Sequence, residues 1–369
     1  EEDHTNRSAA IGGLKEGVTV EENTNAFGTF ANEGKFVDAY MIEKIIDKNG
    51  NVIYEHKSEP VEVFSPQTAY LTFDMLRDVI RNGTAASLNS RLKFRADWAG
   101  KTGTSQDYKD AWFVGVNPNV SMGVWIGYDT PKSLQTTYRG MSYGARNIYL
   151  WANLINAAYD INPELIAPKG QLKMPGGIVR RSFCAISGLL PSDACSKAGL
   201  VQTDLFNAKF VPTKVDDSLQ IGKIVQIGDK KYLALDSTPD EFTETGVILN
   251  PDYVSKIFGV KLSPQQILKS DERFSNILLP DDKMSENGKI PAPVNFTVSG
   301  STVTWSSHPE NDIVGYRVYK DGKKVASIKV GGSLSYSGGP GNYYVTAVDI
   351  AGNESSPGKE AKIGPEKEE

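Results

Sequence analysis

The sequence has few of the residues and patterns that mark metal, nucleic-acid and membrane-spanning proteins. It contains only two cysteines and three histidines, and none of the histidines lies near a cysteine, so a zinc site has almost no support. The net charge of -5 comes without a basic stripe, which argues against nucleic acid as a partner. No apolar run reaches the ~18 residues of a transmembrane helix, and the polar start has no signal-peptide pattern.

The composition is that of a folded protein with more than one domain. The length of 369 residues exceeds the size at which single cores stop growing. The apolar share of 39% and the charged share of 23% are near globular averages. Because the chain opens at Glu1 in polar sequence without an initiator methionine, we expect it to be a piece of a longer polypeptide.

The first 160 residues alternate helix and strand signals, which predicts an α/β or α+β fold. Helices are expected over residues 19–32, 65–83 and 145–158. A hairpin is expected around Asn49-Gly50, and three antiparallel strands are expected from Asp97 onward. The predicted inward faces of the second and third helices are Ala69, Phe73, Leu76 and Ile80, and Ile148, Trp151, Ala152 and Ile155.

The remaining sequence predicts three further parts. Residues 161–288 are punctuated by glycine and proline, and we expect an extension and linker that is ordered only in part. Short, evenly spaced strands over residues 289–363 predict a separate β-sandwich. The charged residues 364–369 are expected to be a disordered tail.

The two cysteines leave two interpretations open. Cys184 and Cys195 flank a stretch rich in glycine, proline and serine, in which a hairpin-like return brings both ends together. A disulfide suits a location outside the cytoplasm. Two small buried thiols are equally compatible with this spacing.

The tripeptide Lys101-Thr102-Gly103 is the main chemical signal. Alone it is common by chance, but AGKTGTSQDYKDAWFVG places it on a predicted strand, after a helix and before two more strands. KTG is one of three motifs, with SxxK and SxN, of serine β-lactamases and penicillin-binding proteins. Its flanks, SAAIGGLKEGVTVEENTNAFGTFANEGKFVDAYMIEKIIDKNGNVIYE and DAWFVGVNPNVSMGVWIGYD, resemble those of class A (bifunctional) penicillin-binding proteins.

The resemblance covers roughly residues 8–205, including FCAISGLLPSDAC, which is similar to a family segment past the catalytic domain. A second resemblance lies between the final block and a fibronectin type III domain, as in some Gram-positive members of the family. There Trp305 corresponds to the early core tryptophan, and Tyr344 and Ala347 lie on a late strand.

The first resemblance implies a peptidoglycan D,D-transpeptidase that cross-links stem peptides through a serine acyl-enzyme, is inhibited by β-lactams and needs no cofactor. Lys101 would supply positive charge beside the nucleophile. Thr102 and Thr104 would hydrogen-bond the substrate carboxylate, and Gly103 would let an extended peptide lie against the strand. The Thr104 backbone N–H is implied as one oxyanion donor.

The same resemblance implies partners and a location. The parent protein would carry a glycosyltransferase domain and an N-terminal anchor, at the extracytoplasmic face of the bacterial cell membrane. Its partners would be stem peptides, β-lactams and the N-terminal half with SxxK and SxN. Cell-wall polymers or division proteins are expected to bind the fibronectin-like domain.

The nucleophilic serine has no credible candidate in the chain. Residues 90–93 and 356–359 fit SxxK, and residues 87–89 fit SxN. The SxN match directly precedes the SxxK match at residues 90–93, which is the wrong order, and both lie only a few residues before KTG. We therefore interpret all three as chance matches. The true motifs are expected to precede Glu1.

Two alternative functions remain. A D,D-carboxypeptidase or serine β-lactamase shares KTG but passes the acyl group to water. A non-catalytic wall-binding scaffold would use only the sandwich. For Asp107 and Tyr108, a cleft position and a turn position are equally consistent with the sequence. Packing, not substrate contact, is expected for the aromatic residues Trp112, Phe113, Trp125 and Tyr128.

Overall fold

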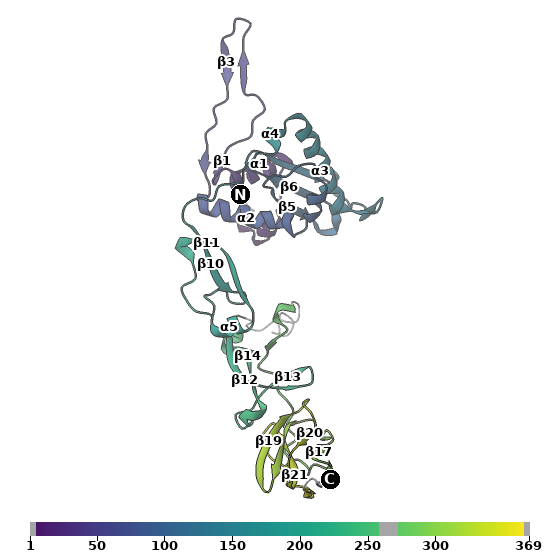
Figure 1. Ribbon diagram of the computed structural model, residues 1–369. Coiled ribbons are helices and arrows are strands. Elements are labelled where there is room, and N and C mark those ends of the chain that lie inside the picture. Colours follow the sequence, from purple (N-terminus) through teal and green to yellow (C-terminus); the bar gives the residue numbers. More distant parts are fainter. Residues whose placement is uncertain (1–4, 258–271, 365–369) are drawn as a thin grey trace. The chain divides into compact units, whose positions relative to one another are not determined.

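The computed structural model describes residues 5–257 and 272–364, and the chain divides into two compact units (Figure 1). The first unit comprises residues 1–181 and 205–211, and the second comprises residues 182–204 and 212–369. The tail after Gly364, which was expected to be disordered, lies outside the described residues. So does His4, one of the three histidines. No helix in the described ranges is long and apolar enough to cross a membrane.

The first unit is a three-stranded antiparallel sheet covered by helices, which confirms the expected α/β or α+β class. Its sheet order is β5-β6-β7. The strands are β5 (Ala99–Thr104), β6 (Ala111–Val116) and β7 (Ser121–Ile126). The helices are α1 (Val20–Ala31), α2 (Pro66–Arg81), α3 (Tyr143–Ile161) and the short α4 (Pro163–Ile166).

Several short elements connect these helices and strands. The 3-10 turns are η2 (Arg7–Ile11), η3 (Ala86–Ser90) and η4 (Gln106–Tyr108). The short strand pairs are β1 (Lys35–Phe36) with β4 (Val61–Glu62), and β8 (Thr137–Tyr138) with β9 (Met141–Ser142). The predicted hairpin is present as β2 (Lys44–Ile46) and β3 (Val52–Glu55), which project from this unit in Figure 1.

Local sequence signals explain where the helices begin. Thr19 caps α1 by accepting from the Glu22 N–H, and the Glu22 carboxylate accepts from the Thr19 N–H, so the predicted capping box is formed. Ser65 caps α2 and Pro66 follows it at the first helical position. In α3 all four predicted inward residues are buried, and the Trp151 ring meets Phe113 of β6 edge to face.

The predicted apolar stripe of α2 packs on the core, and a charged residue that was not predicted is buried beside it. The buried side chains of this helix are those of Ala69, Phe73, Arg77 and Ile80, while Leu76 is only partly buried. Arg77 is buried because an acidic partner, Asp97, meets it inside the unit.

The described part of residues 161–288 contains two sheets. The pair β10 (Ile178–Cys184) and β11 (Val201–Asn207) forms a two-stranded sheet. A four-stranded sheet in the order β13-β12-β14-β15 follows. Its strands are β12 (Leu219–Ile227), β13 (Lys230–Leu233), β14 (Glu244–Leu249) and β15 (Ile277–Leu278). Helical turns in this region are α5 (Asp193–Lys197), η5 (Ala208–Phe210), η6 (Asp240–Phe242), α6 (Pro251–Ile257) and η7 (Glu272–Phe274).

The C-terminal strands form the expected β-sandwich. One sheet has the order β16-β17-β20 and the other has the order β19-β18-β21-β22. Trp305 and Ala347 are buried in the core between them. The strands are β16 (Phe296–Ser299), β17 (Thr302–Trp305), β18 (Ile313–Lys320), β19 (Lys323–Lys329), β20 (Ser335–Ser337), β21 (Gly341–Asp349) and β22 (Ala361–Ile363). The three-residue strands β20 and β22 are too short to leave a sequence signal.

The sandwich also shares a buried contact with the sheet that precedes it in the second unit. Phe242, which is 2% exposed, packs with Val314, Val348 and Ile350 of the sandwich. A Cβ atom added at Gly315 would lie 2.2 Å from the Phe242 ring, so only glycine leaves room for this ring. The predicted boundary near residue 289 therefore crosses a packed contact, and it stays a prediction.

Hydrogen bonds reinforce this contact. Arg317 donates to Glu241 of the preceding segment and to Glu354 of the sandwich. The Thr238 hydroxyl donates to the Ile350 carbonyl. Burial alone would lower the pKa of Arg317, but these two carboxylates outweigh it and raise that pKa above its ordinary value.

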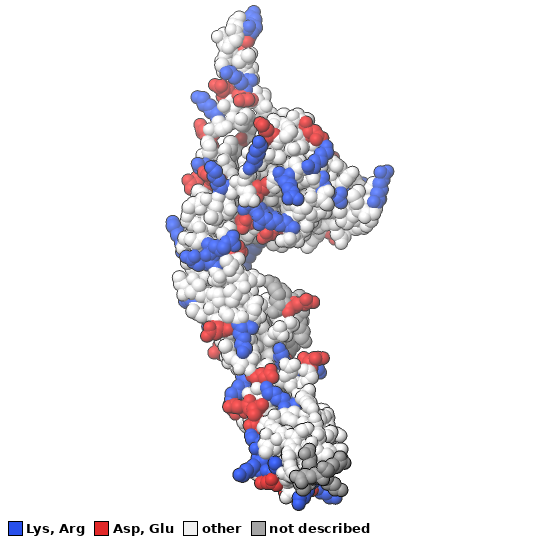
Figure 2. Space-filling view, in the orientation of Figure 1, with Lys and Arg blue, Asp and Glu red and all other residues white. Residues whose placement is uncertain are grey.

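Charged residues of both signs are interspersed on one face of the molecule. Figure 2 shows lysine and arginine side chains alternating with aspartate and glutamate on the face drawn, without a large area of one sign.

We predict that Phe242→Ala will destabilise the second unit by about 3–5 kcal/mol, because it empties the buried contact beneath the sandwich. Urea unfolding measures the change, and the exposed Ile290 of the same unit, at 70% exposure, provides an Ile→Ala control. A loss for Phe242→Ala as small as that of the control would show that the contact contributes little.

Candidate active site

The strand that carries Lys101-Thr102-Gly103-Thr104 lies at the edge of its sheet. Among the described residues β5 pairs only with β6, in the register Lys101↔Val114 and Thr104↔Ala111. The Ser105 N–H donates to the Asp110 carbonyl at 3.2 Å, one residue beyond this register. Because hydrogen-bonded and non-hydrogen-bonded pairs alternate in an antiparallel ladder, the backbone N–H groups of Thr102 and Thr104 point to the free edge.

The side chains of this edge form a polar group. Lys101 is exposed, and its Nζ donates to the Thr102 carbonyl at 2.7 Å. The Thr102 and Thr84 hydroxyls are hydrogen-bonded at 2.7 Å. The Thr104 hydroxyl accepts from the Tyr143 phenol at 2.7 Å. The free edge thus combines an ammonium group, two hydroxyls and two backbone N–H groups, which are the groups that bind a carboxylate and a polarised carbonyl.

Gly103 lies where a side chain would not fit. A Cβ atom added there would lie 2.9 Å from the Cβ of Trp112, its partner on β6. Glycine at this position therefore serves the packing of β5 on β6 as well as any close approach of a ligand.

Asp107 and Tyr108, in the loop after β5, form a turn. Asp107 and Tyr108 both have positive φ, 58° and 56°, inside η4. Two such residues in a row are costly for non-glycine side chains and persist only where the surroundings hold them. Here Leu134 donates to the Tyr108 carbonyl at 2.8 Å, and the Tyr108 ring lies edge to face against Tyr143.

The predicted packing residues beside this loop differ in burial. Phe113 is fully buried, as expected. Trp112 and Trp125 pack on each other across β6 and β7, and the Trp125 Nε1–H donates to Asp110. Tyr128 differs, because it is 43% exposed and lies under the Lys132 ammonium rather than in the core.

A buried ion pair holds the start of β5 against α2. The Arg77 guanidinium binds both oxygens of Asp97 at 2.8 and 2.6 Å, and the two side chains are 4% and 5% exposed. Asp97 also accepts from the Leu172 N–H at 2.8 Å. Burial would lower the Arg77 pKa, but the hydrogen bonds to Asp97, Tyr70 and Asp74 prevail and raise it, so the arginine stays charged.

The chance motifs near the strand have other partners. The Ser90 hydroxyl donates to the Ser87 carbonyl at 3.1 Å, and Lys93 forms an ion pair with Asp160 at 2.6 Å. The Asn89 amide donates to the Ile80 carbonyl at 2.9 Å. No serine–lysine hydrogen bond is present between Ser90 and Lys93 in these described residues, so they lack the arrangement of an activated nucleophile.

Two segments of the chain match known protein families. Residues 3–146 match the penicillin binding protein transpeptidase domain, and residues 174–220 match the C-terminal domain of penicillin-binding protein 1A. Both segments are therefore similar in sequence to penicillin-binding proteins, and the strand β5 lies within the first of them.

Individual relatives agree with these matches over part of the chain. Penicillin-binding protein 1A of Clostridium novyi (strain NT) is 30% identical over 282 residues, which are 75% of this chain and 29% of that protein. Penicillin-binding protein 1A of Aquifex aeolicus (strain VF5) is 43% identical over 129 residues, which are 34% of this chain and 17% of that protein. The chain thus spans less than a third of either relative.

A solved structure also matches in part. Penicillin-binding protein 1A from Haemophilus influenzae, solved as a crystal structure, covers 54% of this chain and 33% of its own, with 22% identity and a TM-score of 0.45.

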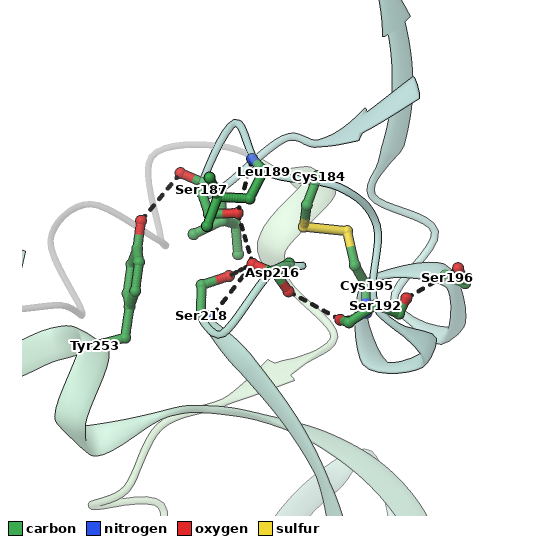
Figure 3. Close-up of a disulfide and its surroundings, with 10 residues drawn as sticks. Cys184, Ser187, Leu189, Ser192, Cys195, Ser196, Asp216, Ser218 and Tyr253 are labelled. Carbon is green, nitrogen blue, oxygen red and sulfur yellow. Dashed lines mark hydrogen bonds between the residues drawn. A yellow bond between two sulfur atoms is a disulfide. The ribbon is translucent and has the colours of Figure 1, made fainter. Parts of the chain in front are cut away.

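The segment matched to the penicillin-binding protein 1A C-terminal domain is held by a disulfide and a buried carboxylate (Figure 3). Cys184 and Cys195 are bonded, with their Cα atoms 6.0 Å apart. Beside them, Asp216 accepts hydrogen bonds from the hydroxyls of Ser187, Ser192 and Ser218. Although the two sulfur atoms and the Asp216 carboxylate are close together, sulfur atoms in a disulfide are not thiolate ligands, and the carboxylate is already hydrogen-bonded.

Sequence reasoning missed Thr84, Tyr143, Arg77 and Asp97. The last two had a detectable signal, since Arg77 lies at helical spacing between Phe73 and Ile80 on an otherwise apolar face. A charged residue at such a position requires a buried partner. Thr84 and Tyr143 had no such signal, because they reach the strand from segments that are distant in the sequence.

We predict that Arg77→Met will destabilise the first unit by about 3–5 kcal/mol, because it leaves the Asp97 carboxylate buried without its partner. Urea unfolding followed by the fluorescence of Trp98 and Trp151 measures the change.

Arg81→Met provides a matched control on the same helix, since Arg81 and its partner Asp78 are 51% and 69% exposed and such pairs contribute little. Adding Asp97→Leu to Arg77→Met should recover part of the lost stability. Equal, small losses for Arg77→Met and Arg81→Met would contradict the structural role given to the ion pair.

Proposed function

We propose that the chain supplies the KTG strand of a serine-type peptidoglycan D,D-transpeptidase that is inhibited by β-lactams. The observation that carries this proposal is the free edge of β5, where the N–H groups of Thr102 and Thr104, two hydroxyls and the Lys101 ammonium occur together. An extended peptide that ends in a carboxylate fits such an edge by adding as a further strand.

Each group has a role in the acyl-transfer reaction. The serine oxygen forms a bond to the carbonyl of the penultimate D-alanine, and the bond to the terminal D-alanine breaks as that residue leaves with a proton. The negative charge that develops on the carbonyl oxygen is stabilised by the Thr104 N–H, together with the N–H of the serine. The Thr102 and Thr104 hydroxyls bind the terminal carboxylate.

Lys101 acts through its charge. Its Nζ is exposed and bonded only to the Thr102 carbonyl among the described hydrogen bonds, so a small rotation brings it to a ligand at the edge. A positive charge there lowers the pKa of a neighbouring proton donor and attracts an anionic substrate. Thr102 and Thr104 remain in place during such a rotation, because Thr84 and Tyr143 hold them.

Transfer to an amine, rather than hydrolysis, is the better-supported outcome. The two relatives described above are named penicillin-binding protein 1A, and one matched segment is the C-terminal domain of that protein. A carboxypeptidase or β-lactamase would use the same edge but admit water to the acyl-enzyme. In the second step the amine nitrogen bonds to the acyl carbon, and the serine oxygen leaves and regains a proton.

The serine and lysine of SxxK and the SxN motif are proposed to come from residues that precede Glu1 in the parent protein. Support comes from the contacts of Ser90 and Lys93. The Ser90 hydroxyl donates to the Ser87 carbonyl and Lys93 pairs with Asp160, so the two side chains do not bind each other. A glycosyltransferase domain, an extracytoplasmic membrane location and a fibronectin type III identity of the sandwich are part of the same proposal. Cell-wall polymers or division proteins would be the partners of that sandwich.

We predict that Lys101→Ala in the complete enzyme will lower the rate of acylation by a fluorescent penicillin by about 100-fold, the scale of losing one preorganised electrostatic group. Stopped-flow labelling measures the rate. Lys109→Ala is a control, because Lys109 lies in the loop that follows β5 and forms an ion pair with Asp107.

The chain of residues 1–369 alone should give no adduct that survives denaturation. Stoichiometric labelling of this chain would refute the placement of the serine. An unchanged acylation rate in Lys101→Ala would remove Lys101 from the site.

A further inference from the structure

Thr104 receives a hydrogen bond from outside its own sheet. Tyr143, the first residue of α3, donates its phenol O–H to the Thr104 Oγ1 at 2.7 Å. Its position is fixed by the Ser142 cap of the helix and by its own N–H, which donates to the Thr136 carbonyl at 3.0 Å. Tyr143 thus reaches β5 from a segment that lies 39 residues further along the chain.

The phenol ring of Tyr143 is held on its other side by the strained loop. The Tyr108 ring lies 5.0 Å from the Tyr143 ring at an interplanar angle of 69°. Tyr108 adopts φ of 56°, directly after Asp107 at 58°. Positive φ at two successive non-glycine residues is found where the surroundings enforce it, often at functional sites. Here it places an aromatic ring against the residue that contacts Thr104.

The hydrogen-bond inventory of a hydroxyl gives this contact a chemical meaning. A threonine hydroxyl has one hydrogen to donate and two lone pairs that accept. A phenol is a stronger acid than an alcohol, so Tyr143 is the natural donor of the pair. When the Thr104 oxygen accepts from Tyr143, its own hydrogen remains available for a carboxylate, which can only accept.

We propose that Tyr143 is a positioning residue that directs the Thr104 hydroxyl hydrogen toward the carboxylate of the substrate or β-lactam. The inference rests on the proposed function of β5. It assigns a role to a residue outside the KTG motif and to the Tyr108 ring that supports it. The Thr102 hydroxyl differs from that of Thr104. In its hydrogen bond with Thr84 either oxygen can donate, so the direction of the Thr102 hydroxyl hydrogen is fixed less strictly.

The test uses Tyr143→Phe in the complete enzyme, which removes the hydroxyl and keeps the ring against Tyr108. Acylation is measured at increasing concentrations of benzylpenicillin and of its methyl ester, which lacks the free carboxylate. We expect acylation efficiency with benzylpenicillin to fall about tenfold, the scale of weakening one hydrogen bond to a charged group. The ester should react equally with both enzymes. Tyr149→Phe on the same helix, where Tyr149 is 42% exposed, should match the wild type.

A double-mutant cycle separates positioning from a general structural effect. In a Thr104→Val background, Tyr143→Phe should cause no further loss, because the hydroxyl to be oriented is gone. Tyr108→Leu retains the Tyr143 phenol but removes the ring that packs against it, so it should give a smaller loss of acylation efficiency with benzylpenicillin. This variant replaces Tyr143→Phe in the test if Tyr143→Phe does not fold.

The outcomes are distinct. Wild-type efficiency of folded Tyr143→Phe with benzylpenicillin, or an equal loss with the ester or in the Thr104→Val background, would overturn the inference and leave the proposed function intact. If the wild-type complete enzyme forms no acyl adduct at all, the proposed function fails, and the inference fails with it.

Discussion

The ion pair between Arg77 and Asp97 determines where the candidate site lies. Asp97 lies two residues before Ala99, the first residue of β5, and Arg77 lies in the second half of α2. Their bidentate contact therefore fixes the start of the strand against the helix. Both side chains are buried, so each charge is stable there only while the other is bonded to it. The Leu172 N–H, which donates to the same carboxylate, ties the chain beyond α4 to this point. Everything that β5 presents at its edge depends on this anchor.

From that anchor the polar edge of β5 follows by local rules. The antiparallel register with β6 turns the N–H groups of Thr102 and Thr104 outward, and the period of two along a strand places both side chains on one face. Two residues from other segments, Thr84 and Tyr143, then hold the two hydroxyls. Preorganisation of this kind reduces the free-energy cost of ordering the donors when a ligand binds.

The sequence predicted the parts of this arrangement that local patterns control. The capping box at Thr19, the Ser65-Pro66 start of α2, the inward face of α3 and the three strands of the sheet were all predictable, because caps and periodicity act within a few residues. Contacts between distant segments were not. Arg77 and Tyr143 were missed, because their partners Asp97 and Thr104 are distant in the sequence. The sheet of β12 to β15 was also missed, since glycine and proline punctuation masks strands that pair only in the folded unit.

The most direct test of the central claim is a crystal structure of the complete transpeptidase domain acylated by a penicillin. The free edge of β5 should then hold the acyl group, with the acyl carbonyl oxygen accepting from the Thr104 N–H. The penicillin carboxylate should lie within hydrogen-bond distance of the Thr102 and Thr104 hydroxyls. An acylated serine whose penicillin lies on another surface, or a Thr104 N–H paired with a strand of the protein, would contradict the account.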